Sequence, residues 1–76
     1  VSAGTVEPLH EQLIATEITA VVSGTVLLAG RVLGPGDVLV IPPRTPAVFR
    51  AVTDAVLVVI KTPSSPADKR VLAPGA

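Results

Sequence analysis

Short runs of aliphatic and β-branched residues, separated by glycine and proline, dominate the chain after residue 16. No run is long enough for a comfortable helix, and the enrichment in Val, Ile and Thr favours extended backbone. The expected strands are Glu17 to Val22, Thr25 to Ala29, Val38 to Ile41, Ala47 to Val52 and Ala55 to Lys61. Short strands joined by turn residues at roughly ten-residue spacing are typical of a sandwich or barrel. The pattern therefore predicts an all-β fold.

The two ends of the chain are less regular. In residues 1–14 the apolar positions fit one helical stripe as well as an irregular strand, so both remain open. Those positions are Leu9, Leu13 and Ile14. Toward the C-terminus the composition turns to Ser, Pro, Asp and Lys, which predicts a polar surface tail held by Val71 and Leu72. We expect a barrel over residues 1–62 and this tail over residues 63–76.

Alternation along two of the expected strands indicates which side chains face inward. Successive residues of a strand point to opposite faces, so Glu17 and Thr19 share one face. After the Pro-rich turn, Ala47 and Phe49 alternate with Arg50, which belongs in solvent or at an interface. Ala47 and Phe49 should therefore face the interior.

Size, charge and composition exclude several classes of function. The 76 residues allow one domain, and six basic side chains balance six acidic ones. The balanced charge does not indicate a surface that binds nucleic acid or acidic substrates. The arginines are scattered along the chain and have no aromatic neighbours that could stack on bases. The absence of Cys excludes disulfides and thiolate metal sites. With one His and no nucleophile elbow, a Ser-His-Asp arrangement is excluded as well.

No segment resembles a membrane span or a targeting signal. The apolar runs at 38–43 and 55–60 are far shorter than the roughly 20 residues of a spanning helix. The chain begins with Val and lacks the basic region that opens a signal peptide. We expect a trimmed soluble protein with a cytoplasmic location.

The aliphatic content predicts self-association. Hydrophobic residues make up 49% of the chain, and Phe49 is the single aromatic residue among them. The runs at 38–41 and 55–60 are apolar on both faces, which is typical of strands buried on both sides. A small domain without disulfides is also marginally stable alone. We therefore expect a homo-oligomer, a dimer in which these outer faces pack together.

Two motifs resemble those of the cupin superfamily. The turn Gly34–Asp37 precedes four aliphatic residues and the Pro-rich segment Pro42–Pro46, as in the second cupin motif. Upstream, His10–Gln12, Glu17 and Gly24 have the spacing of the first motif, in which two His precede a Glu and a Gly follows seven residues later. The resemblance covers residue 10 to about residue 63 and implies a minimal jelly-roll β-barrel of short antiparallel strands.

The same resemblance implies a degenerate metal site. Metal-binding cupins use two His and a Glu from the first motif and a His from the second. The first His and the Glu correspond to His10 and Glu17, whereas the other two His positions hold Gln12 and Ala47. A methyl group cannot ligate a metal. We therefore expect either no metal or a weakly bound divalent ion held by His10, Glu17 and the amide oxygen of Gln12.

The resemblance and the strand alternation together predict a pocket. Its expected lining residues are His10, Gln12, Glu17, Thr19, Ala47 and Phe49. An inward carboxylate is costly unless it is paired or hydrated, so Glu17 favours a wet cavity. For His10 the alternative is a partly exposed residue near the chain start. The turn at Gly34–Asp37 is structural, since glycine supplies positive φ and the Asp side chain caps the turn.

These observations favour a small cupin domain that acts as a small-molecule-binding or scaffold domain. The sequence does not separate natural loss of the metal ligands from their deliberate removal. The alternative is a metal-dependent cupin enzyme of the dioxygenase, isomerase or decarboxylase type, in which the metal acts as Lewis acid and template. A structural oligomerisation module is the third candidate.

Overall fold

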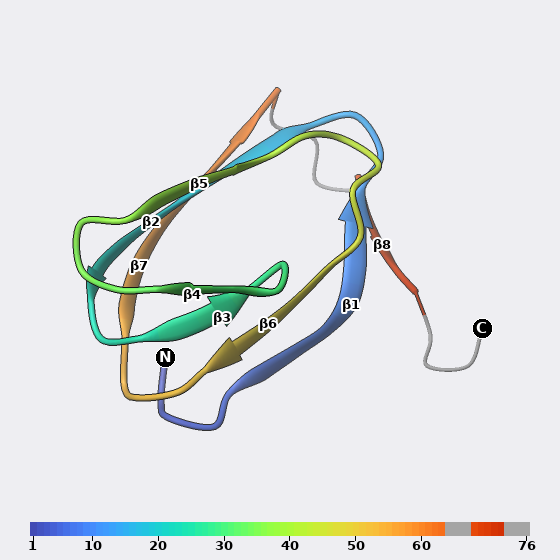
Figure 1. The fold of residues 1–76 in the computed structure, drawn as a ribbon. Coiled ribbons are helices and arrows are strands. Elements are labelled where there is room, and N and C mark those ends of the chain that lie inside the picture. The colour runs from blue at the N-terminus through green and yellow to red at the C-terminus, as the bar shows by residue number, and fades with distance from the viewer. Residues whose placement is uncertain (64–67, 73–76) are drawn as a thin grey trace.

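A computed structural model describes residues 1–63 and 68–72, which form two antiparallel sheets without a helix (Figure 1). The strands are β1 (Val6–Gln12), β2 (Thr16–Ser23), β3 (Val26–Leu28), β4 (Arg31–Leu33), β5 (Val38–Ile41), β6 (Ala47–Ala51), β7 (Val56–Thr62) and β8 (Lys69–Val71). The larger sheet has the order β4-β3-β6-β1-β8 and the smaller one β5-β2-β7. The predicted all-β class is confirmed for this part of the chain. It contains no helix long and apolar enough to cross a membrane.

One hydrophobic core joins the inner faces of the two sheets. The smaller sheet contributes Val21 and Ile41, and the larger one contributes Val26, Leu28 and Phe49 among others. Burial along β6 alternates from residue to residue, so its Ala and Phe side chains point inward while its Arg is exposed. This agrees with the alternation predicted from the sequence. The two sheets therefore face each other across a shared interior.

Two turns depend on the glycines of the cupin-like motifs. Gly24 separates β2 from β3 at φ +83°, and a Cβ there would lie 2.1 Å from the carbonyl oxygen of Asp54. No other residue fits this position without moving the backbone. In the second turn Gly36 has φ +87°, and the Asp37 carboxylate accepts a hydrogen bond of 2.8 Å from the Gly34 N–H. The structural role expected for this turn is confirmed.

The first segment, left open between helix and strand, is a strand with a bulge. Glu7 pairs with Phe49 and His10 pairs with Ala47, so β1 holds one more residue than β6 between these two pairs. Pro8 lies inside the bulge, where its missing N–H disturbs no regular ladder. A bulge reverses the alternation of side chains beyond it. The side chains of Glu7 and His10 can therefore face the same side of the sheet.

Two short strands extend the larger sheet beyond the sequence expectation. The run expected over residues 25–29 ends at Leu28, and Ala29 and Gly30 form a two-residue turn into β4. In the tail, β8 pairs with β1, and the Leu72 N–H donates to the Leu9 carbonyl at 2.8 Å. The Val71 side chain is 54% exposed and does not anchor the tail. Backbone hydrogen bonds between β8 and β1 hold this segment against the larger sheet.

Candidate functional site

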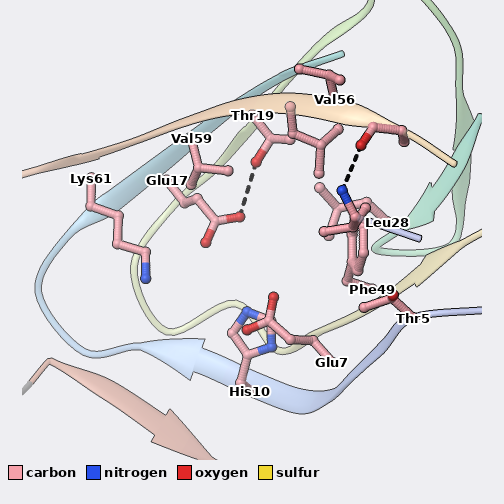
Figure 2. Close-up of a pocket in the computed structure, with 13 residues that line it drawn as sticks. Thr5, Glu7, His10, Glu17, Thr19, Leu28, Phe49, Val56, Val59 and Lys61 are labelled. Atoms are coloured by element: carbon pink, nitrogen blue, oxygen red, sulfur yellow. Dashed lines mark hydrogen bonds between the residues drawn. The ribbon is translucent and has the colours of Figure 1, made fainter. Parts of the chain in front are cut away.

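A cavity of about 540 Å³ opens between the inner faces of the two sheets. Its size lies within the range of small-molecule sites in proteins. We call one group of lining residues the polar end; it consists of Glu7, His10, Glu17, Thr19 and Lys61. We call another group the apolar wall; it consists of Leu28, Phe49, Ala55, Leu57 and Val59. Figure 2 shows Glu17 and Lys61 at one side of the cavity, and Leu28 and Phe49 at the other.

The smaller sheet supplies one acidic and one basic side chain to the polar end. Glu17 on β2 and Lys61 on β7 are direct cross-strand partners, and both line the cavity. The Glu17 residue is only 7% exposed, and its carboxylate accepts a hydrogen bond of 3.1 Å from the Thr19 hydroxyl. Figure 2 shows both side chains extending into the cavity. The Thr19 hydroxyl replaces part of the hydration that this carboxylate loses on burial.

The larger sheet places an imidazole opposite them. His10 is 4% exposed, so the alternative of a partly exposed histidine is wrong. Its Nδ1 lies 2.9 Å from the carbonyl oxygen of Pro8. Because a carbonyl only accepts, Nδ1 donates the hydrogen bond, and whenever the ring is neutral Nε2 is the nitrogen that carries the lone pair. The bulge in β1 thus supplies both the orientation of the ring and the partner that fixes its tautomer.

Glu7 joins the polar end through an ion pair. Its carboxylate binds the ammonium group of Lys69 on β8. Partial burial raises the pKa of Glu7. The hydrogen bond from Lys69 and its positive charge lower the pKa by more, and His10 and Lys61 lower it further by smaller amounts. The pKa of Glu7 consequently lies below its ordinary value. The Glu7 carboxylate therefore stays ionised and adds negative charge beside the imidazole.

Gln12 and Ala47 lie in the interior but are not among the residues that line the cavity. Both are 3% exposed, and Ala47 belongs to the hydrophobic core. Gln12 Nε2 has no hydrogen-bond partner among the described residues. Of the six expected pocket residues, the four that line the cavity are His10, Glu17, Thr19 and Phe49.

Sequence reasoning missed two charged members of the polar end. Glu7 lies out of phase with His10 in a regular strand, and only the bulge brings both to the cavity. Pro8 within an extended segment was the available signal, since proline inside a strand marks an edge or a bulge. For Lys61 the signal was its alternation with Leu57 and Val59 on one face of β7.

The described residues contain no compact cluster of His, Cys, Asp and Glu ligands. Within residues 1–63 and 68–72, no three of these side chains lie close enough together to hold a divalent metal ion. The Ala47 methyl group cannot donate, and the ammonium group of Lys61 faces the same cavity as Glu17. Like charges repel, so this ammonium opposes a bare metal cation, which brings no counter-charge of its own, at the Glu17 carboxylate. The polar end combines two carboxylates, an ammonium group and an imidazole instead.

No protein-family model matches the sequence, and no curated protein matches it. The resemblance to cupins therefore rests on the two motifs alone.

Proposed function

We propose that the chain is a small cupin-like β-barrel domain that binds an amphipathic small molecule in the cavity between its sheets. The observation that carries the proposal is the composition of that cavity. Buried ionisable groups, Glu17 at 7% and His10 at 4% exposure, line it together with an aliphatic and aromatic wall. Cavities that combine an apolar lining with a few convergent polar groups are the usual form of a ligand site.

Blocking the cavity from one strand of its lining tests this proposal. Val59 lines the cavity, whereas Val58 does not, and each is 49% exposed. The probe is hexanol, with binding followed by NMR titration. We expect Val59→Trp to fill the cavity and weaken hexanol binding about tenfold or more, whereas the matched control Val58→Trp leaves it unchanged. Equal binding by the two variants would place the hexanol outside the cavity and refute the proposal.

A metal-dependent cupin enzyme is the second candidate, and one observation favours it. His10 and Ala47 are direct cross-strand partners, so their Cβ atoms lie on the same face about 4.5–5.5 Å apart. Gln12 follows His10 by two residues and shares its face. Three of the four motif positions are therefore neighbours in the larger sheet, although Gln12 and Ala47 occupy two of them in place of His.

Restoring the ligands distinguishes the two candidates. We expect the double variant Gln12→His with Ala47→His to bind Zn²⁺ several orders of magnitude more tightly than the parent chain, because it completes a set of three His and one Glu. Titration calorimetry with Zn²⁺ measures both proteins. Tight stoichiometric binding by the parent chain would favour the metal-dependent enzyme over the metal-free binding domain.

A further inference from the structure

We infer that the cavity takes the zwitterion of an aliphatic α-amino acid. This inference rests on the proposed function and specifies its ligand. Such a molecule carries an ammonium group and a carboxylate on neighbouring carbons, and an apolar side chain beyond them. The cavity offers a partner for each of these three parts.

The first observation is that an acidic and a basic side chain, Glu17 and Lys61, lie side by side without forming an ion pair. Glu17 and Lys61 face each other directly across β2 and β7, which places their Cβ atoms about 4.5–5.5 Å apart. Within the described part of the chain, no ion pair forms between them. Figure 2 shows the two side chains ending apart in the same open space. That space borders an anion and a cation at once.

The second observation is the unused acceptor capacity of the polar end. Within residues 1–63 and 68–72, the hydrogen bond that the buried Glu17 carboxylate accepts from a side chain comes from Thr19 and reaches one of its two oxygens. The other carboxylate oxygen thus has no side-chain donor among these residues, and in the neutral form of His10 Nε2 is a second acceptor, since Nδ1 donates to Pro8. An ammonium group has N–H donors to spare for both acceptors.

The third observation is the charge balance. The Glu7 and Lys69 charges pair with each other, which leaves Glu17 and Lys61 as opposite charges at the cavity. A lone carboxylate ligand would satisfy Lys61 and leave Glu17 without a counter-charge, and a lone amine would do the reverse. Glu17 is buried, so leaving its charge without a partner is strongly unfavourable, whereas the exposed Lys61 loses less when it is left unpaired. A zwitterion satisfies both charges and leaves the cavity neutral.

The apolar wall fits the remainder of the ligand. Leu28, Phe49 and Leu57 line the cavity beside the polar end and present no polar side-chain atom. An aliphatic side chain placed against them leaves water, whereas a polar one would lose hydrogen bonds without replacement. The cavity therefore prefers leucine-like over serine-like amino acids.

Four ligands that share an isobutyl group test the inference by NMR titration. Leucine carries both charges, isocaproate lacks the ammonium group, isopentylamine lacks the carboxylate, and α-hydroxyisocaproate replaces the ammonium group by a neutral hydroxyl. We expect leucine to bind about tenfold or more tightly than each of the other three. Lys61→Met should lower leucine affinity to that of isopentylamine. Arg31→Met removes an exposed cation that does not line the cavity and should change nothing.

The outcomes separate this inference from the proposed function. Similar affinities for all four ligands, with hexanol still blocked by Val59→Trp, would refute the zwitterion and leave the binding site standing. Tighter binding of α-hydroxyisocaproate or isocaproate than of leucine would also refute it, because the ligand would then be a simple anion. Failure of hexanol and of all four ligands to bind would refute both.

Discussion

Buried polar side chains in this small protein differ in how many of their polar atoms have hydrogen-bond partners. The Asp68 carboxylate, 3% exposed, accepts hydrogen bonds from the backbone N–H groups of Ile14 (2.7 Å) and Ala15 (2.9 Å). Glu17 accepts one from Thr19, and Gln12 Nε2 has no partner among the described residues. Asp68 is thus a structural group that closes the turn after β1, whereas Glu17 retains capacity for a ligand.

Removing the Asp68 carboxylate should destabilise the fold. Asp68→Ala leaves the Ile14 and Ala15 N–H groups without their acceptor, at a cost of about 2 kcal/mol or more in the free energy of unfolding. Asp54→Ala is the control, because Asp54 is exposed and its side chain accepts a backbone hydrogen bond from Ala3. It should cost less than about 1 kcal/mol. Urea denaturation measures both, and equal losses would contradict the structural role of Asp68.

The elements of the fold are held together by specific turns. The hairpin of β3 and β4 turns at Ala29 and Gly30, with φ values of 51° and 76°. Positive φ at both central residues defines a type I′ turn, whose favoured sequence is Asn-Gly. Alanine in this conformation carries strain that asparagine tolerates better.

Ala29→Asn should therefore stabilise the protein. We expect a gain of about 0.5–1 kcal/mol in the free energy of unfolding, since Asn adopts the left-handed conformation more readily than Ala. The β-branched control Ala29→Val should lose stability. Thermal denaturation followed by circular dichroism measures both variants, and an Asn variant no more stable than the Val variant would show that this turn is not strained.

The strands that could be predicted are those with uninterrupted β-branched runs. These runs, bounded by glycine and proline, locate the main parts of β2, β5, β6 and β7, and in β2 and β6 the alternation also indicates the inward face. Periodicity could not decide β1, where Pro8 and the bulge break the alternation. It missed β4 and β8, which are three residues long and contain Arg or Lys, so that pairing with a neighbour rather than composition makes them strands.

The same physics limited the prediction of the site. Glu17, Thr19 and Phe49 could be assigned to the interior from alternation, and His10 from the cupin-like motif. Alternation also assigns Ala47 to the interior, where it is buried, but Gln12 is placed in the pocket by the motif alone, and neither residue lines the cavity. Nothing in the local sequence shows that residues from β1 and β7 border one cavity, because that depends on how the two sheets pack.

At the scale of the whole molecule, the outer face of the smaller sheet is apolar. Ile18 pairs with Val40 and Ile60, and the next outward row joins Ala20 to its neighbours Val38 and Val58. The four valine and isoleucine residues of β5 and β7 in these rows are 49% to 59% exposed. Continuous apolar patches of this kind commonly mark interfaces. We propose that a second copy of the chain packs on this face in a twofold dimer.

A charge on this face should separate the dimer. Sedimentation equilibrium of the unaltered chain should give twice the monomer mass of 7.7 kDa at high micromolar concentration. Ile60→Glu should give monomers, because packing the faces would then bury an unpaired charge. Val32→Glu, at a 69% exposed position on β4 of the other sheet, should leave the dimer intact. A monomeric parent chain at that concentration would contradict the proposal.

The central claim is that a small amphipathic molecule binds between the two sheets, and the location of bound hexanol tests it most directly. Nuclear Overhauser effects between hexanol and methyl-labelled protein report which side chains lie within a few ångströms of the ligand. The account predicts contacts to Leu28, Leu57 and Val59, which line the cavity. Contacts confined to Val38, Val40 and Ile60 on the outer face would contradict it.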